Sequence, residues 1–231
     1  MTELLSELLS GNAAHAASVP NDRLRAVQSG QRPDFVSICC SDSRVSQEGM
    51  WSIDRPGRLF TPSNIGNQVW DDHAGDRIVD GSILYPIHHC GTEAIVVVGH
   101  TGCGAVTAAY RTAMGEEPPG PAGVRKWVEM LLPVIEAGLD SAQIDETAEE
   151  AVLVDQLVEY NVDQQVTFLE RAAAVPDHVE IYGFVYDFQG VYGDELGRAY
   201  LVNLDGETDP HAIARRVPDR YEPAVRSVLF E

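Results

Sequence analysis

Three residues with metal-binding side chains stand at two separated points of the sequence. Cys40 ends the apolar run DFVSICC, and His100 and Cys103 closely follow the apolar run AIVVV. Thiolate and imidazole groups are common zinc ligands, and catalytic zinc sites have three protein ligands with a fourth position kept for water or substrate. The sequence therefore predicts a Cys₂His zinc site, provided that the two segments meet in space.

A purely structural zinc site would have four protein ligands, and Asp42 is the obvious candidate for the fourth. Cys39 is a weaker candidate, because neighbouring residues on a strand point to opposite faces, and a buried thiol is its simpler interpretation. A phosphatase loop would need an arginine six positions after its cysteine. Counting from Cys39 leads to Val45 and counting from Cys40 leads to Ser46, so that chemistry is excluded.

Both metal-binding segments follow stretches that are typical of buried strands. The run at 34–40 is short, apolar and bounded by polar residues, and the run at 95–98 is entirely apolar and mostly β-branched. After the run at 95–98, the sequence predicts a glycine-containing turn and then a helix that starts near Cys103. Because the working edge of a parallel α/β sheet lies at the carboxyl ends of its strands, the two segments are expected at one edge.

The remaining pattern predicts an α/β fold with a central, mostly parallel four-stranded sheet, an antiparallel fifth edge strand and flanking helices. We expect a single domain at 1–231 with an N-terminal helical arm at about 1–30. Strands are expected near 34–40, 58–63, 91–100, 178–188 and 197–206, the last of them antiparallel. Helices are expected at 2–10, 21–29, 77–90, 124–137, 147–174 and over most of 209–230.

The composition limits the possible partners. The chain has 36 acidic and 16 basic residues, for a net charge of −20, and such a surface repels nucleic acid. Strong negative charge with no long acidic tail predicts a salt-adapted, halophilic protein. No apolar run reaches the roughly 20 residues of a membrane span, and the glutamates before the first leucines do not fit a secretory signal. We therefore expect a cytoplasmic protein that does not associate with a membrane.

The segments CSDSR (40–44) and HTGCG (100–104) together resemble the two metal-binding motifs of the β-class carbonic anhydrases. The likeness extends to DRPGRLF…SNIGN (54–67) and to YGFVYDFQG (182–190), and it covers roughly residues 20–205. The paired motifs are highly specific. The resemblance implies the fold of that family and an enzyme that needs zinc.

The resemblance implies that Cys40, His100 and Cys103 bind Zn²⁺. Asp42 and Arg44 would form the catalytic dyad of the family. With Asp42 paired to Arg44, the fourth zinc position is open to water; with the pair broken, Asp42 occupies that position and the site is closed. A forked, permanent cation is suited to this task, since arginine binds a carboxylate through two hydrogen bonds.

The resemblance also implies that Gln31, Phe60 and Tyr85 line the substrate pocket, as in the plant-like branch of the family. The bacterial allosteric branch has a tryptophan where Ser37 stands, so constitutive activity without an inhibitory bicarbonate site is expected. Two positions depart from the family. They are Ser63, where an arginine is usual, and Leu84, where a glutamate is common.

The implied activity is the reversible hydration of carbon dioxide to bicarbonate and a proton. Two alternatives remain open: hydrolysis of carbonyl sulfide or carbon disulfide at the same centre, and a non-enzymatic zinc-binding scaffold. The implied assembly is a homodimer or a higher oligomer built from dimers. No proton shuttle is evident, although His73, His88 and His89 are candidates.

Overall fold

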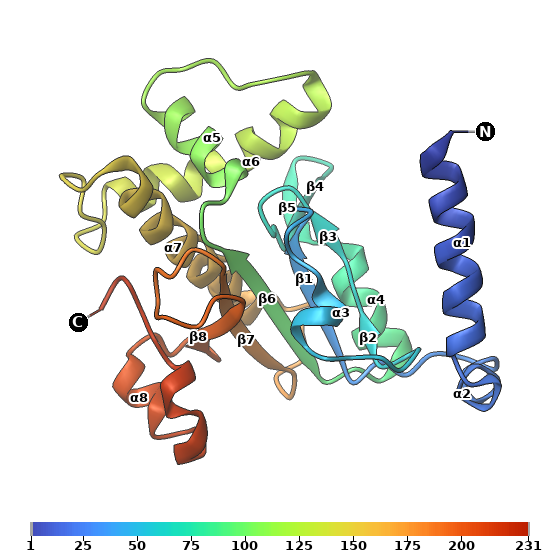
Figure 1. Cartoon of the computed structure of the whole chain (residues 1–231). Helices are drawn as coiled ribbons and strands as arrows, with labels where there is room; N and C mark the ends of the chain where they lie inside the picture. Colours follow the sequence, from blue (N-terminus) through green and yellow to red (C-terminus); the bar gives the residue numbers. More distant parts are fainter. Residues whose placement is uncertain (1, 231) are drawn as a thin grey trace.

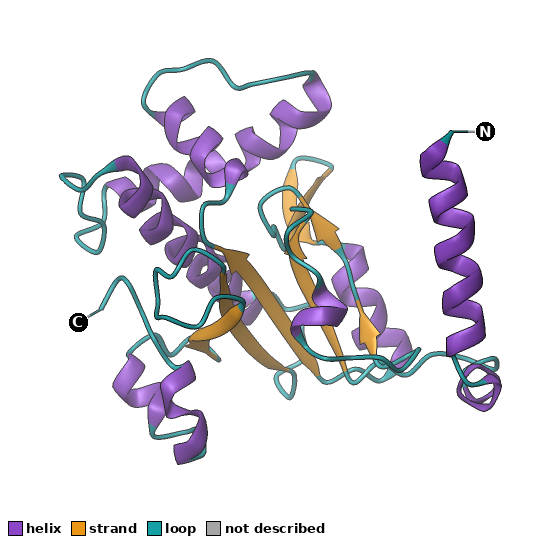
Figure 2. Cartoon of the chain, viewed as in Figure 1, coloured by secondary structure: helices purple, strands orange, loops and turns teal. Residues whose placement is uncertain are grey.

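The computed structural model describes residues 2–230, so Met1 and Glu231 of the expected domain lie outside the described part. Strands occupy the centre of the molecule and helices surround them, with the N-terminal helix standing away from the body (Figure 1). The same view coloured by secondary structure shows this separation of a strand layer from its helices (Figure 2). The predicted α/β architecture is therefore confirmed.

The central sheet has the strand order β2-β1-β6-β7-β8, and β3 also pairs with β1. All neighbours run parallel except β7 and β8, so the predicted antiparallel edge strand is confirmed. The strand predicted at 58–63 is divided into two short pieces, β2 and β3. The bounds are β1 Phe35–Cys40, β2 Leu59–Phe60, β3 Ser63–Asn64, β6 Ala94–His100, β7 Glu180–Asp187 and β8 Arg198–Leu204.

The register of β1 and β6 brings their carboxyl ends together. Cys39 pairs with Val98, so Cys40 and His100 end adjacent parallel strands at one edge of the sheet. Gly99 precedes His100 and lies against helix α7 (Glu150–Arg171), where an added Cβ would approach a Val162 methyl to 2.8 Å. Glycine at this position therefore allows α7 to pack directly behind the metal-binding edge.

Helices cover the two faces of the sheet unequally. The main core joins Ile38 and Cys40 to side chains of α4, α5, α6 and α7. A small cluster on the opposite face contains Cys39 and Val98, with Trp51 packed against it just after α3. The bounds are α3 Gln47–Met50, α4 Gly81–Cys90, α5 Gly104–Ala113, α6 Ala122–Leu139, α7 Glu150–Arg171, α8 Pro210–Ala214 and the 3₁₀-helix η1 Asp219–Ala224.

The helix predicted at 77–90 begins only at Gly81. Asp80 caps it, because its carboxylate accepts the N–H of Ser82 at 2.7 Å. The preceding residues form an antiparallel hairpin that the sequence did not predict, with Gly75 at positive φ in its turn. The hairpin strands are β4 Trp70–His73 and β5 Asp76–Val79.

The prediction of a mostly helical tail at 209–230 is wrong over much of its length. Only two short helical segments form there, α8 and η1. Pro218 and Pro223 lie in this stretch. Because proline has no N–H to donate and clashes with the preceding turn, two prolines five residues apart disfavour a continuous helix through this stretch.

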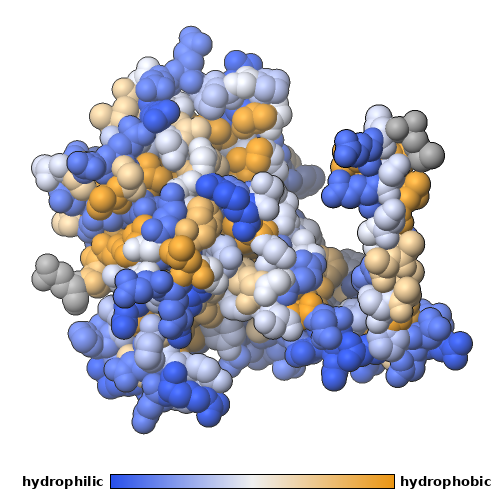
Figure 3. All heavy atoms as spheres, viewed as in Figure 1, coloured by the Kyte–Doolittle hydropathy of each residue, from blue (hydrophilic) through white to orange (hydrophobic). Residues whose placement is uncertain are grey.

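The N-terminal segment forms two helices, α1 Glu3–Ser18 and α2 Asn21–Ala26, the first longer than predicted. Neither helix buries a side chain completely. Apolar surface is visible along the separated helix at the right of the space-filling view (Figure 3). None of the helices between residues 2 and 230 is long and apolar enough to cross a membrane. The exposed leucines of α1 are Leu4, Leu5, Leu8 and Leu9.

Candidate metal centre

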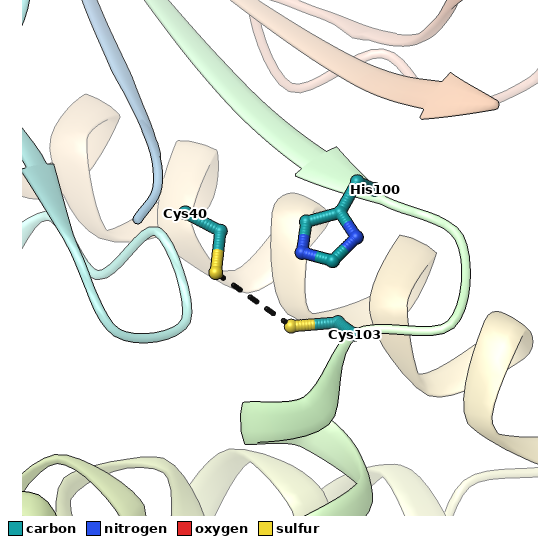
Figure 4. Close-up of side chains that lie close together, drawn as sticks. All are labelled: Cys40, His100 and Cys103. Carbon is teal, nitrogen blue, oxygen red and sulfur yellow. Dashed lines mark hydrogen bonds between the residues drawn. The ribbon is translucent and has the colours of Figure 1, made fainter. Parts of the chain in front are cut away.

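Cys40, His100 and Cys103 converge at the carboxyl edge of the sheet (Figure 4). Cys40 ends β1, His100 ends β6, and Cys103 is the N-cap of α5. Their ligand atoms lie within 4.8 Å of one another, and all three residues are buried. The two segments that the sequence predicted to meet do so.

The pleat of β1 separates its two cysteines. Cys40 faces the main core, while Cys39 lies in the cluster on the opposite face of the sheet. Burial raises the pKa of the Cys39 thiol to about 12, which keeps it a neutral thiol. Cys90 is partly exposed at the end of α4, and all four cysteines are free thiols. Cys39 and Cys90 therefore do not join the cluster.

The imidazole of His100 is oriented as a metal ligand would be. Its Nδ1 lies 3.0 Å from the backbone carbonyl oxygen of Thr101, an acceptor to which Nδ1–H donates. That bond leaves Nε2 with a free lone pair, and Nε2 is buried without a hydrogen-bond partner. A buried acceptor without a partner is costly unless a metal or proton satisfies it.

The sulfur atoms of Cys40 and Cys103 are 3.9 Å apart. Two thiolates on one tetrahedral zinc ion, each with a Zn–S distance near 2.3 Å, would be separated by about 3.8 Å. The contact with the Cys103 sulfur lowers the pKa of the Cys40 thiol, which favours the thiolate form that binds a metal ion. The donor set of two sulfurs and one imidazole nitrogen thus fits zinc in type and spacing.

Asp42 lies beside this cluster, held by Arg44. Nε of Arg44 donates to Oδ1 of Asp42 at 2.8 Å, and Nη2 donates to Oδ2 at 2.6 Å. These bonds hold the pKa of the Asp42 carboxyl well below its usual range, so it is ionised. Oδ2 also lies 3.7 Å from Nε2 of His100. A small movement would therefore take the carboxylate from Arg44 to the ligand atoms.

The loop between His100 and Cys103 is held by hydrogen bonds to α7 and to the end of β7. The N–H of Gly102 donates to Oδ1 of Asp155 on α7 at 2.8 Å. Gly102 has φ +60°, and a Cβ there would approach the Gln189 side chain to 2.7 Å. The hydroxyl of Thr101 donates to Asp187 at 3.3 Å. The sequence gives no local signal for Asp155, because it lies 53 positions from the glycine it binds.

The three predicted pocket residues do not reach the cluster within one chain. Phe60 pairs with Val36 of β1, roughly 13 Å along the strand from Cys40 at 3.3 Å per residue. Tyr85 is half-exposed, and its ring centre lies 6.2 Å from that of Phe60. Gln31 lines a surface hollow of about 500 Å³ beside the start of β1. All three belong to the amino end of β1, whereas the cluster lies at the carboxyl end.

The two departures from the family are accommodated locally. The side-chain amide of Gln47 donates to Oγ of Ser63 at 2.9 Å, so a polar contact exists where the family has arginine. Leu84 packs against the main core. Among the candidate proton carriers, Nε2 of His88 lies 2.8 Å from the Ala174 carbonyl oxygen, while the ring of His89 lies against that of Tyr85.

Comparison with known sequences identifies the family. The sequence profile of the family described as "Carbonic anhydrase" matches residues 35–191. A carbonic anhydrase of Pseudomonas aeruginosa is 32% identical over 180 residues, which cover 76% of this chain and 78% of the relative. A carbonic anhydrase of Emericella nidulans is 29% identical over 177 residues, covering 76% of this chain and 72% of the relative. The chain belongs to the carbonic anhydrase family.

Solved structures place the fold in the β class. A β-carbonic anhydrase of Aspergillus fumigatus matches with a TM-score of 0.69 at 25% identity, covering 93% of this chain and 97% of that chain. A tetrameric β-carbonic anhydrase of Sordaria macrospora matches with a TM-score of 0.71 at 22% identity, covering 87% and 98%. The resemblance found in the two sequence motifs thus extends to the whole fold.

Proposed function

We propose that this protein catalyses the reversible hydration of carbon dioxide to bicarbonate and a proton, with a zinc ion held by Cys40, His100 and Cys103. The observation that carries the proposal is the partnerless Nε2 of His100 facing two cysteine sulfurs, next to an Asp42–Arg44 pair. The family match supports this activity over hydrolysis of carbonyl sulfide or carbon disulfide. A zinc-binding scaffold would be expected to have four permanent protein ligands.

Each residue of the centre has a different role in the proposed reaction. When bound, zinc supplies Lewis acidity that makes a water molecule nucleophilic near neutral pH. Asp42, kept ionised by Arg44, accepts a hydrogen bond from the reacting water and directs it toward the carbon atom. The bond from Nδ1 of His100 to the Thr101 carbonyl oxygen fixes the imidazole orientation, and the cluster itself excludes bulk solvent.

We place Gln31, Phe60 and Tyr85 in the substrate pocket of a second copy, since they lie far from the cluster of their own chain. In a shared pocket, Phe60 and Tyr85 provide an apolar wall and the Gln31 amide donates to the developing bicarbonate oxygen. Two inactive chains, Cys40→Ser and the double variant F60A/Y85A, test this. Co-assembly should restore activity toward half of the wild-type level, because one of the two sites is then complete. No recovery in verified mixed dimers would contradict a shared pocket.

The same proposal assigns the chain to the plant-like branch, active without inhibition by bicarbonate. It is supported by Gln31, Phe60 and Tyr85 together, by Ser37 in place of tryptophan, and by the Asp42–Arg44 pair, which leaves the coordination site free. Initial rates measured at increasing bicarbonate should follow simple product competition. Sigmoidal inhibition would contradict this assignment.

The whole chain is proposed to work as one α/β domain with a helical arm at about 1–30 that contacts a second copy. One core cluster extends from Val36 to partly buried Leu229, which supports a single folding unit. The exposed leucines of α1 support assembly, and a relative is described as tetrameric. Sedimentation of the full chain should show a dimer or a multiple of dimers, and a monomer at micromolar concentration would contradict it.

The environment is proposed to be a salty, reducing cytoplasm. The net charge of −20 supports salt adaptation, because concentrated salt screens self-repulsion. A reducing compartment would keep Cys40 and Cys103 available as metal ligands. The free energy of unfolding should rise between 0.1 M and 2 M KCl. A fall over that range would contradict the salt-adapted assignment.

Stopped-flow hydration of carbon dioxide, measured together with zinc content, tests the central proposal. Cys40→Ser should remove zinc binding and lower kcat/KM by at least about a thousandfold, since metal catalysis is lost. Cys39→Ser is the matched control, because the neighbouring thiol faces away from the cluster. A zinc-free wild-type protein that remains fully active, or a Cys39 variant that loses zinc while Cys40→Ser keeps it, would overturn the assignment.

A further inference from the structure

Arg44 contacts a second group besides Asp42. Its guanidinium carbon lies 4.4 Å from the centre of the Phe188 ring, within the range of a cation–π interaction. The side chain of Arg44 is half-exposed, with 51% of its surface accessible. Ion pairs at such positions contribute little on their own, because water competes and two side chains must be ordered. An aromatic surface beneath the guanidinium restricts its motion.

The Phe188 ring is attached to the metal-binding edge. It stacks on the imidazole of His100, with ring centres 5.7 Å apart and planes inclined by 24°. Its backbone N–H donates to the hydroxyl of Thr101 at 3.3 Å. The ring therefore links Arg44 to the loop that carries His100 and Cys103.

Asp187 fixes the chain direction at this ring. It is fully buried at the end of β7. Its carboxylate accepts the N–H groups of Gln189 and Gly190 at 2.9 Å and that of Tyr192 at 2.8 Å. This turn brings Phe188 out of the strand and over the cluster. The position of the ring is thus determined by the fold and does not depend on its contact with Arg44.

We propose that Phe188 is a positioning residue that holds the Arg44 guanidinium and so keeps Asp42 away from the metal coordination position. Without the ring, Arg44 samples other directions, and Asp42 is free to turn toward His100, 3.7 Å away. Phe188 thereby favours the open form of the site. The effect on the metal rests on the zinc centre proposed above, whereas the contact between ring and guanidinium does not.

The first test uses metal-free protein. Exchange of the Arg44 Nε hydrogen with water is measured by ¹⁵N NMR, with the signal assigned by its loss in Arg44→Lys. Phe188→Ala should speed this exchange about tenfold, the loss expected for one partly desolvated cation–π contact. Phe188→Tyr should restore slow exchange, because it keeps an aromatic face. Phe168→Ala removes another partly buried ring, on α7, and should leave the exchange rate of the Arg44 Nε hydrogen unchanged.

The second test uses cobalt-loaded protein and azide, which binds at an open coordination position and changes the visible spectrum. Phe188→Ala should weaken azide binding about tenfold, because Asp42 then competes, and in an Asp42→Asn background the effect should disappear. The proposal would be overturned if Phe188→Ala had the same Arg44 Nε exchange rate and the same azide affinity as the wild type. Equal damage in Phe188→Tyr or Phe168→Ala would also overturn it, by indicating general loosening. A wild-type protein that takes up no cobalt or zinc would refute the proposed metal centre, while the exchange measurement would still decide the role of the ring.

Discussion

Two aspartates, Asp42 and Asp163, have opposite electrostatic environments. Asp42 lies at the sheet edge and accepts three hydrogen bonds from Arg44, two from its side chain and one from its backbone. Its pKa is held below the usual range. Asp163 lies inside helix α7 and accepts one hydrogen bond, from Asn203 of β8, at 2.9 Å. Burial raises the pKa of Asp163 to about 8, and the nearby charge of Glu159 adds to the effect.

The difference shows how location decides the role of a carboxyl group. An arginine beside Asp42 supplies a permanent charge, so the ionised form is the stable one and is available for chemistry. No such cation is among the groups that shift the pKa of Asp163, and the low polarity of the core favours its neutral form. Asp163 belongs to a row of buried acids on α7, together with Asp155 and Glu159, that bind other parts of the chain.

The largest difference should appear when Asp42 loses its charge. Asp42→Asn should lower kcat/KM on the order of a thousandfold, because a neutral amide accepts the hydrogen bond of the reacting water more weakly than a carboxylate does and no longer forms an ion pair with Arg44. Stopped-flow hydration with zinc analysis measures this. Asp54→Asn is the control, since Asp54 also pairs with an arginine, Arg23, but on the exposed surface. An Asp42→Asn variant within threefold of wild type would remove Asp42 from the mechanism.

Replacing Glu159, one of the buried acids of α7, should have a smaller effect, which falls on stability. Glu159 accepts hydrogen bonds from the hydroxyls of Tyr192 and Ser227 and from the N–H of Val228. Glu159→Ala leaves one buried donor, the Tyr192 hydroxyl, and two partly buried donors without this partner, and should lower the free energy of unfolding by about 3 kcal/mol. Urea denaturation measures the change. Exposed Glu149→Ala should cost only a few tenths of a kcal/mol, and equal losses in the two variants would contradict this role for Glu159.

The smallest change per step concerns the pH dependence of stability, where one pH unit alters the free energy of unfolding by less than Glu159→Ala does. Folded Asp163 keeps a proton that the unfolded chain releases, because its pKa rises from 3.8 to about 8 on folding. Its contribution is therefore complete below pH ~4 and is lost as the pH rises toward ~8, with a slope of at most about 1.4 kcal/mol per pH unit. Asp163→Asn keeps a neutral acceptor for Asn203 and should remove this slope.

Urea unfolding of both proteins at pH 5, 6, 7 and 8 measures that slope. The free energy of unfolding of Asp163→Asn should rise relative to that of the wild type at each increase in pH. Parallel curves for the two proteins would mean that Asp163 is already ionised in the folded state. Asp42→Asn, by contrast, should leave the slope above pH 5 unchanged, because Asp42 is ionised in both the folded and the unfolded protein at those pH values.

The fold was predictable where each strand is apolar along its whole length. The strands β1 and β6 are nearly continuous buried runs, so their type and their order before a glycine turn were evident. The hairpin at 70–79 was missed, because its sequence WDDHAGDRIV is largely polar and five of its strand residues are exposed beside a short turn. The tail was predicted as mostly helical, but it forms two short helical segments in a stretch that contains Pro218 and Pro223.

The site was predictable to the extent that its residues are close in sequence or belong to specific motifs. Asp42 and Arg44 lie two positions apart, so their pairing could be read directly. Asp155 and Phe188 reach the cluster only because α7 and β7 pack beside β6. No local pattern marks Asp155, and the resemblance of the segment 182–190 to the family gives Phe188 no role at the site. The pocket residues were predicted by resemblance alone, and one chain does not place them beside the cluster.

A helix of 16 residues that buries none of its side chains has a thermodynamic consequence. Isolated helices of this length are marginal in water, because their nucleation is costly and packing normally stabilises them. The order of α1 should therefore be supplied by whatever covers its leucines, which in the proposed assembly is a second copy. Helical content, followed by circular dichroism, should then fall on dilution in proportion to subunit dissociation, so that folding of the arm reports the binding equilibrium.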